Sequence, residues 1–90
     1  MQITDVRIKL VTGESRLRAI ATITFNDSFV IHDIRVIEGE KGLFVAMPSK
    51  KMANGEFRDI AHPIHADMRK VIEDFVKEAY EKALTEQPAE

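Results

Sequence analysis

The sequence contains no cysteine. This absence excludes a disulfide framework, a thiol nucleophile, an iron–sulfur cluster and a zinc site with cysteine ligands, and it fits a reducing compartment. No apolar run approaches the roughly 18 residues that a membrane-spanning helix needs. Residues 1–6 also lack the charged and apolar regions of a signal peptide. The sequence therefore predicts a cytoplasmic protein that makes no contact with a membrane.

Neither sign of charge dominates, because the chain has 13 Lys and Arg residues and 15 Asp and Glu residues, which gives a net charge of −2. Such a balance gives no general attraction to nucleic acid or to an anionic membrane, so binding to either requires a local patch. A chain of 90 residues has room for one small domain. A domain of this size buries only roughly 60–65% of the surface that its unfolded chain exposes, so a partner chain would stabilise it.

The first half of the chain has the pattern of β-strands. Strand patterns occupy four segments, 6–10, 16–25, 29–37 and 43–47. The first two alternate apolar with polar residues, as strands with one buried face do. The polar turn at 26–28 predicts a hairpin between the second and third strands. The fourth segment is apolar throughout, which is typical of a strand covered on both faces.

The last part of the chain predicts an amphipathic helix over 66–84. Pro63 blocks a helix from starting earlier, and His65 occupies the N-cap position. Apolar residues then recur every three or four positions, which is the spacing of one buried stripe. They are Met68, Val71, Ile72, Phe75, Val76, Ala79, Tyr80 and Ala83. We expect Val71, Ile72 and Phe75 to dock the helix, and residues 85–90 to form a polar, disordered tail.

These patterns predict one α+β domain over residues 1–84, made of an antiparallel four-stranded sheet, a long basic loop and one C-terminal helix. The third and fourth strands carry apolar residues on both faces, whereas one helix covers only one face of a sheet. The other face, or an edge of the sheet, then has a reason to contact a second chain. The expectation is a homodimer that pairs through the sheet.

The predicted loop, residues 49–64, has no clean periodicity, and its Asn54-Gly55 pair favours a tight turn. Loops of this length are usually functional or disordered. Apolar residues within the loop, such as Met52 and Ile60, argue against disorder. The loop is therefore expected to be an ordered excursion with a function.

Basic charge concentrates around this loop. Residues 41–58 hold four cations and one carboxylate, namely Lys41, Lys50, Lys51, Arg58 and Glu56. Lysine and arginine on a loop beside a sheet can contact phosphates, and a dimer would double the patch. Phe57, next to Arg58, can stack on a base. The alternative is that the lysines belong to a solvated loop and that Phe57 belongs to the core.

No group of residues predicts catalysis. Pro63 separates His62 from His65 and prevents the continuous helix on which the two could share a metal. His32 lies among apolar residues, which favours a core or interface position. No serine lies in a nucleophile elbow, and no glycine-rich loop precedes a helix. We therefore expect no enzyme activity, metal, cofactor or small-molecule substrate.

The loop contains two long motifs, Pro48-Ser49-Lys50-Lys51-Met52 and Gly55-Glu56-Phe57-Arg58-Asp59-Ile60-Ala61-His62-Pro63-Ile64. Both resemble the signature of the stage V sporulation protein G family, also called the septation regulator SpoVG. Residues 3–8, 21–25 and 29–37 are similar to the family as well, so the resemblance covers residues 1 to about 84. Ala53-Asn54 replaces the Pro-Asp that often precedes the loop glycine in the family, and Asn-Gly keeps the turn chemistry.

The resemblance implies a small bacterial cytoplasmic protein that binds DNA, and in some members RNA, as a dimer and regulates septation, sporulation or other gene expression. Family binding is attributed to basic residues of the loop and of the start of the helix, which here are Lys50, Lys51, Arg58, Arg69 and Lys70. For Arg69 and Lys70 the alternative is a pair of exposed charges on an amphipathic helix. The alternative function is a protein–protein interaction module whose acidic helix contacts another regulator without nucleic acid.

Overall fold

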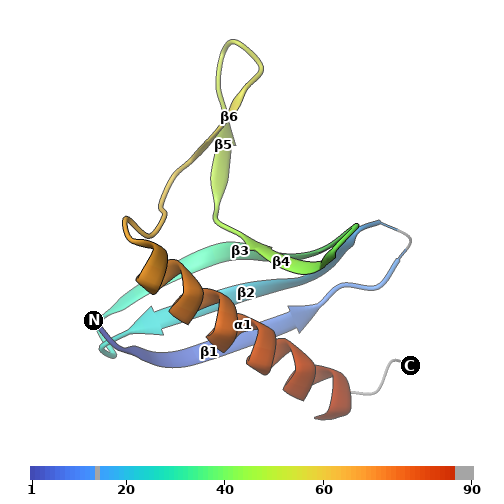
Figure 1. Cartoon of the computed structure of the whole chain (residues 1–90), viewed down its shortest axis with the longest axis vertical. Helices are drawn as coiled ribbons and strands as arrows, with labels where there is room; N and C mark the ends of the chain where they lie inside the picture. Colours follow the sequence, from blue (N-terminus) through green and yellow to red (C-terminus); the bar gives the residue numbers. More distant parts are fainter. Residues whose placement is uncertain (14, 87–90) are drawn as a thin grey trace.

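A computed structural model describes residues 1–13 and 15–86 of the chain. Its main sheet is antiparallel and has the strand order β1-β2-β3-β4. These strands are β1 (Ile3–Leu10), β2 (Leu17–Phe25), β3 (Phe29–Gly39) and β4 (Gly42–Ala46). Helix α1 (Ala66–Glu86) lies across one face of this sheet (Figure 1). The predicted α+β class, with four antiparallel strands and one C-terminal helix, is confirmed.

The hydrophobic core lies between the sheet and α1. From Ala19 onward every second residue of β2 is buried, which is the expected result of its alternating sequence. Two of these residues, Ala19 and Ala21, are fully buried and have no bulk beyond Cβ. The closest approaches of α1 to the sheet are to β1 and β4. The other buried residues of the core are Ile23, Phe25, Ile34, Val36, Val45, Met47, Ile72, Val76 and Tyr80.

The predicted docking of α1 is wrong in part. Ile72 is buried as expected, but Val71 is 39% exposed and Phe75 is 44% exposed. The buried line of the helix follows the i, i+4 series Ile72, Val76 and Tyr80. A residue advances about 100° around a helix, so Phe75 lies about 60° from Ile72 and Val71 about 100° from it. Both therefore lie at the border of the buried stripe, and the stripe in the sequence is wider than the face that docks.

Helix α1 also ends later than predicted. It continues through Glu86, so residues 85 and 86, assigned to the polar tail, are helical. The rest of the predicted tail, 87–90, lies outside the described residues. Among the residues that the structure describes, no helix is both long and apolar enough to cross a membrane.

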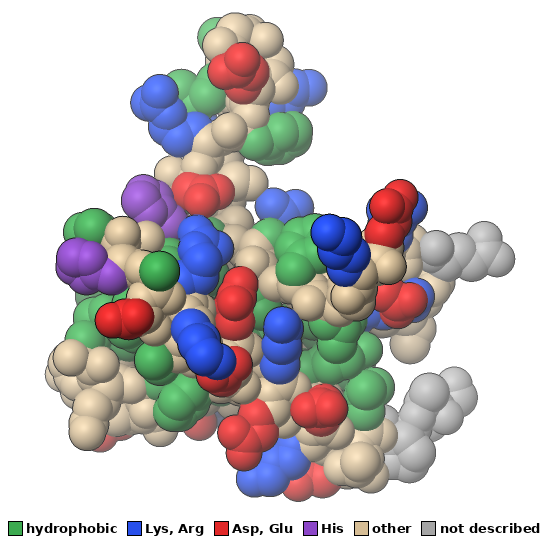
Figure 2. Space-filling view, in the orientation of Figure 1, with side chains coloured by type: hydrophobic (Ala, Val, Ile, Leu, Met, Phe, Trp, Pro, Cys, Tyr) green, Lys and Arg blue, Asp and Glu red, His purple; other side chains and the backbone are tan. Residues whose placement is uncertain are grey.

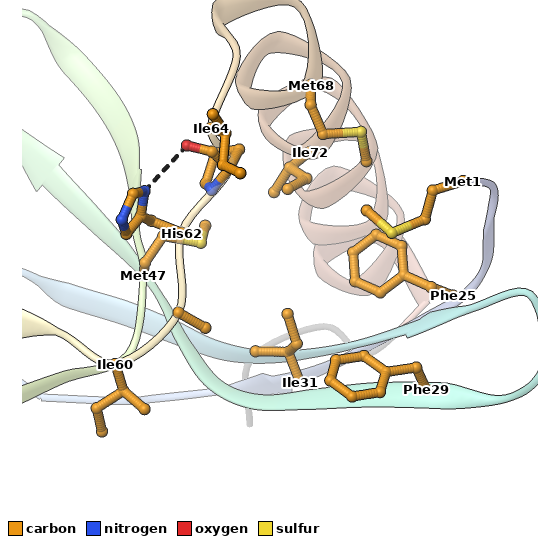
Figure 3. Close-up of a pocket in the computed structure, with 12 residues that line it drawn as sticks. Met1, Phe25, Phe29, Ile31, Met47, Ile60, His62, Ile64, Met68 and Ile72 are labelled. Carbon is orange, nitrogen blue, oxygen red and sulfur yellow. Dashed lines mark hydrogen bonds between the residues drawn. The ribbon is translucent and has the colours of Figure 1, made fainter.

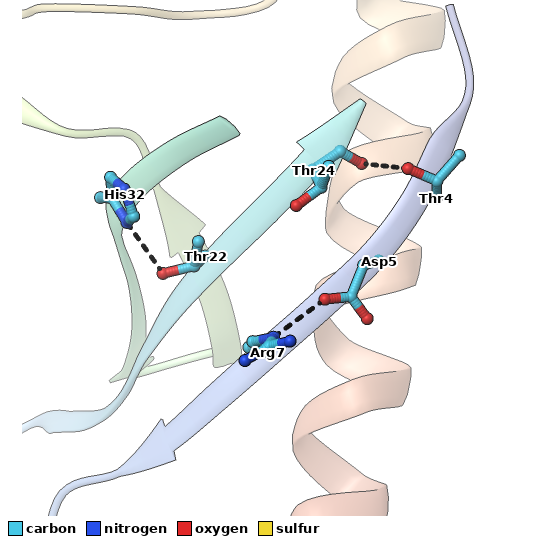
Figure 4. A network of polar contacts seen from close by, with 6 residues as sticks. All are labelled: Thr4, Asp5, Arg7, Thr22, Thr24 and His32. Carbon is cyan, nitrogen blue, oxygen red and sulfur yellow. Dashed lines mark hydrogen bonds and ion pairs between the residues drawn. The ribbon is translucent and has the colours of Figure 1, made fainter. Parts of the chain in front are cut away.

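The face of the sheet away from α1 is irregular at one position of β3. Ala21 pairs with Ile34 and Ile23 pairs with Ile31, so Thr22 faces two residues of β3, His32 and Asp33. This is a β-bulge, and Asp33 adopts the left-handed conformation with a φ of 63°. The hydroxyl of Thr22 lies 3.4 Å from Nδ1 of His32 (Figure 4). His32 is exposed, so it does not lie in the core, and the other expectation for it, an interface position, stays a prediction.

The predicted loop contains an ordered β-hairpin. Strands β5 (Ser49–Lys51) and β6 (Phe57–Asp59) pair with each other and project away from the main sheet (Figure 1). Asn54 and Gly55 lie at the tip, as the sequence predicts, and Gly55 has a φ of 89°, which favours glycine. The Asn54 side chain accepts a hydrogen bond from the backbone N–H of Glu56 at 3.0 Å. The whole hairpin, from residue 49 to residue 59, is called the arm below.

Candidate nucleic-acid interface

The arm is held by its own backbone rather than by packing. At its base, the N–H of Ile60 donates to the carbonyl of Pro48 at 2.7 Å, and near the tip the N–H of Met52 donates to that of Glu56 at 2.6 Å. Pro48 has no N–H, so it ends the pairing of β4 and lets the chain turn into the arm. Every residue from 51 to 60 is exposed. Side chains on both faces of the arm are therefore free to meet a ligand.

Two of the predicted site residues face each other directly across the arm. Lys50 pairs with Arg58 in the ladder, and Lys51 pairs with Phe57 in the next rung. Because side chains alternate along a strand, Lys50 and Arg58 lie on one face of the arm and Lys51 and Phe57 on the other. Within the described residues, none of the three cations has a carboxylate within ion-pair distance. The structure thus brings Lys50, Lys51 and Arg58 together on one element.

Like charges directly opposite each other destabilise a strand pair. The Lys50–Arg58 pair therefore costs the arm some stability, and an anion placed between the two side chains would remove that cost. A phosphate group fits this need because lysine and arginine are its usual partners.

Phe57 belongs to the surface and not to the core. Its side chain is 69% exposed, so the alternative that it packs in the interior is wrong. The ring belongs to β6, opposite Lys51 of β5 and next in sequence to Arg58. Exposed aromatic rings beside cations are typical of surfaces on which unpaired bases stack.

Arg69 and Lys70 lie on a different element, at the start of α1. The ammonium of Lys70 forms an ion pair with Asp74, one turn along the helix, at 3.1 Å. Arg69 is exposed, and its backbone N–H donates to the carbonyl of His65 at 3.1 Å, which confirms His65 at the N-cap position. A connection without regular secondary structure, residues 60–65, separates these two cations from the arm. The structure does not bring the two groups into one cluster.

The distribution of charge differs between the arm and the body of the molecule. Figure 2 shows lysine and arginine side chains on both sides of the arm, with an acidic group near its tip. Over α1, by contrast, basic and acidic side chains alternate. Over residues 49–59 the arm carries three cations and two carboxylates, Glu56 and Asp59, so its net charge is +1, whereas that of the whole chain is −2.

An apolar groove of about 430 Å³ lies at the start of α1 (Figure 3). The sequence did not predict this second surface. Its walls come from the ends of β2 and β3, the 60–65 connection and α1, and they include Phe25, Phe29, Ile31, Met47, Ile64 and Met68. At its edge, Nδ1 of His62 donates to the carbonyl of Pro63 at 3.0 Å. The groove holds no charged side chain that could recognise a phosphate. The sequence showed these apolar residues but gave no sign that the chain leaves them uncovered.

The three histidines are not arranged as a metal site. Within residues 1–13 and 15–86, no group of three or more potential ligands of the His, Cys, Asp or Glu type lies close enough to hold a metal ion. His62 and His65 also lie in the connection before α1 rather than on one helical face.

Comparisons with known proteins agree with the resemblance of the loop motifs. The family model described as SpoVG matches residues 1–82. A protein of Acholeplasma laidlawii named "Putative septation protein SpoVG" is 70% identical over 84 residues, which are 93% of this chain and 89% of that protein. Proteins of the same name from Clostridioides difficile and Clostridium beijerinckii are 57% and 53% identical, over 96% and 100% of this chain and 94% and 99% of their own lengths. The chain belongs to the SpoVG family.

Proposed function

We propose that the protein is a nucleic-acid-binding regulator, and that the arm contacts the phosphates of DNA or RNA. The observation that carries the proposal is the Lys50–Arg58 pair, two like charges that face each other across an exposed hairpin with no carboxylate partner in the described part of the chain. Phosphate contacts supply most of the affinity of a surface of this kind and read no sequence. The protein acts by occupying nucleic acid and performs no reaction.

The relatives named after septation suggest the process in which this binding operates. In the proposal, the protein takes part in septation or sporulation by regulating gene expression. The link between binding and septation rests on those names and not on the geometry of the arm.

The active form in this proposal is a homodimer. The sheet face away from α1 carries Ile37 and Phe44, which are cross-strand neighbours on β3 and β4. Phe44 is 45% exposed, so a second copy has apolar surface to cover there. A dimer doubles the number of arms, and with them the cations that reach one nucleic acid.

A protein-interaction module is the second candidate function, and one observation favours it. Val71 and Phe75, one turn apart on α1, are 39% and 44% exposed, so the helix presents apolar surface to solvent. A helix of another regulator could bury both residues through the usual i, i+4 contacts.

Titration at several salt concentrations tests the main proposal. The double variant Lys50→Ala and Lys51→Ala removes two positive charges per chain. If all four lysines of a dimer contact phosphates, the slope of log affinity against log salt on duplex DNA falls by roughly 3–4. The control variant Lys77→Ala and Lys82→Ala removes the same charge from α1 and leaves the slope unchanged. A wild-type slope in the Lys50 and Lys51 variant would contradict the proposal.

A further inference from the structure

The open face of the sheet meets the base of the arm in a pocket of about 300 Å³. Its lining includes Ile20, Asp33, Arg35, Ser49, Phe57 and Ile60. Ile20 and Arg35 are cross-strand neighbours on β2 and β3, whereas Phe57 and Ile60 come from the arm and the residue after it. The pocket therefore combines apolar walls with one guanidinium, one carboxylate and one exposed aromatic ring.

Arg35 has a fixed side chain with unused donors. Its guanidinium is partly buried and donates to the hydroxyl of Ser49 at 3.0 Å. This bond ties the side chain to the first residue of β5. Within the described residues, no carboxylate forms an ion pair with Arg35. A guanidinium has five N–H donors, so several remain for a ligand in the pocket.

Asp33 reaches the pocket because of the β-bulge in β3. Bulges redirect side chains, and a residue other than glycine in the left-handed conformation is frequent at functional sites. Asp33 has this conformation, with a φ of 63°. Its carboxylate adds an acceptor to the donors of Arg35 along the same pocket.

We propose that this pocket binds one unpaired guanine base of a nucleic-acid strand, a proposal that rests on the proposed function of the arm. Arginine donates to O6 and N7 of guanine, and a carboxylate accepts from the N1–H and N2 amino group beside them. Adenine has an amino donor where guanine has O6, so it would face Arg35 with a mismatched group. The ring of Phe57 stacks on the base, and the adjacent phosphates lie along the arm. The base must be unpaired because a duplex occupies its Watson–Crick edge.

Fluorescence anisotropy with single-stranded 12-mers tests the proposal. One oligonucleotide is all dT, and the others carry one central dG, dA or inosine. A good base contact discriminates by roughly 5- to 150-fold, so we expect the dG strand to bind at least about 5-fold tighter than the dT and dA strands. Inosine lacks the N2 amino group and should lose part of this preference.

The variant Asp33→Asn removes the charge and keeps the shape and the tolerance for the left-handed backbone. It should abolish the preference for dG and leave binding to dT intact. Asp27→Asn is a matched control, because Asp27 is another left-handed aspartate, with a φ of 51°, and lies in the β2–β3 turn outside the pocket. It should keep the preference. Circular dichroism checks the fold of both variants.

Failure of this inference is distinguishable from failure of the proposed function. Equal binding of all strands by the wild type, with loss of binding in the Lys50→Ala and Arg58→Ala variant, would overturn only the guanine pocket. No binding of any single strand would overturn the guanine pocket, and it would overturn the proposed function as well only if duplex DNA also failed to bind. Phe57→Leu gives a further test. If this variant lowered the mass measured by light scattering from two chains to one and kept the preference for dG, the pocket would be a contact between copies, and the inference would be overturned.

Discussion

The facing cations of the arm are the residues whose placement is best explained by a ligand. The carboxylate next in sequence to Arg58, Asp59, pairs with Ser49, whereas Lys50 and Arg58 pair with each other. A structural role for this rung would be better served by one cation and one carboxylate, since opposite charges across a strand pair stabilise it by roughly 0.2–1 kcal/mol.

A charge reversal at Arg58 should affect the stability of the protein and its affinity for nucleic acid in opposite directions. Arg58→Glu places opposite charges across the arm, so the free energy of unfolding should stay unchanged or rise by up to about 1 kcal/mol. Affinity for nucleic acid should fall strongly at low salt, because the variant turns a phosphate contact into a repulsion. Urea denaturation and an anisotropy titration measure the two effects.

Lys82→Glu is the control for that experiment because it makes the same charge change on α1, away from the arm. It should reduce affinity much less than Arg58→Glu. Equal losses in the two variants would show that only the net charge matters and that the arm is not the contact.

At the residue scale, the sequence predicts which residues form the site better than it predicts which of them lie opposite each other. The cations of the arm were predictable because basic residues cluster visibly in 41–58. The pairing of Lys50 with Arg58 was not predictable, since the register of a three-residue strand depends on where the turn begins. Asp33 was equally hidden, because its bulge comes from a register shift between β2 and β3 that no local pattern in 29–37 reveals.

Among the elements, α1 offers a direct test of which side chains anchor it. Ile72 is 4% exposed and Phe75 is 44% exposed. Ile72→Ala should therefore cost about 2–5 kcal/mol of unfolding free energy, whereas Phe75→Ala should cost about 1–2 kcal/mol, less than the 3–5 kcal/mol of a fully buried ring. Urea denaturation of both variants measures the difference. A larger cost for Phe75→Ala would mean that the ring is buried in solution, for example by a partner.

The arm should behave as an element whose shape matters for binding and little for the core. Gly55 has a φ of 89° with open space around its Cα, so Gly55→Ala adds backbone strain and no clash. The strain is of order 1–2 kcal/mol and falls on the tip of the arm. We expect weaker binding of nucleic acid with an almost unchanged melting temperature, because the arm packs little on the core.

Gly55→Asn is the matched variant for this test, since asparagine tolerates positive φ better than alanine. It should recover part of the lost affinity. If Gly55→Ala lowered the melting temperature as much as Ile72→Ala, the arm would be part of the cooperative core and this description would fail.

Sequence patterns predict the helix and the long strands of this protein and not the short strands. Four strands and the helix were predictable, because alternation and the three-four spacing report which faces are buried. The arm was recognisable only as an ordered excursion with an Asn-Gly turn, since strands of three residues are too short to display a period. The docking face of α1 could not be resolved within its apolar stripe, because the width of the contact depends on how the helix lies across the sheet, where it approaches β1 and β4 most closely.

At the scale of the molecule, apolar surface remains uncovered on two sides. One is the groove at the start of α1, with Phe29 64% exposed and Ile64 86% exposed. The other is the open face of the sheet, with Phe44 45% exposed. A second copy that covered one of these surfaces would stabilise a chain of 90 residues, and a twofold dimer would use the same patch on both copies.

The sequence predicts a dimer that pairs through the sheet, and substitutions on the two apolar surfaces distinguish this interface from one at the groove. If the copies pair through the open face, Phe44→Ser should shift the mass in light scattering from two chains toward one at micromolar concentration. Phe29→Ser removes an equally large ring at the groove on the α1 side and should leave the mass unchanged. The opposite pattern would move the interface to the groove, and a wild type with the mass of one chain would reject the dimer. Dissociation should also weaken binding to long nucleic acids, because each chain then brings only one arm.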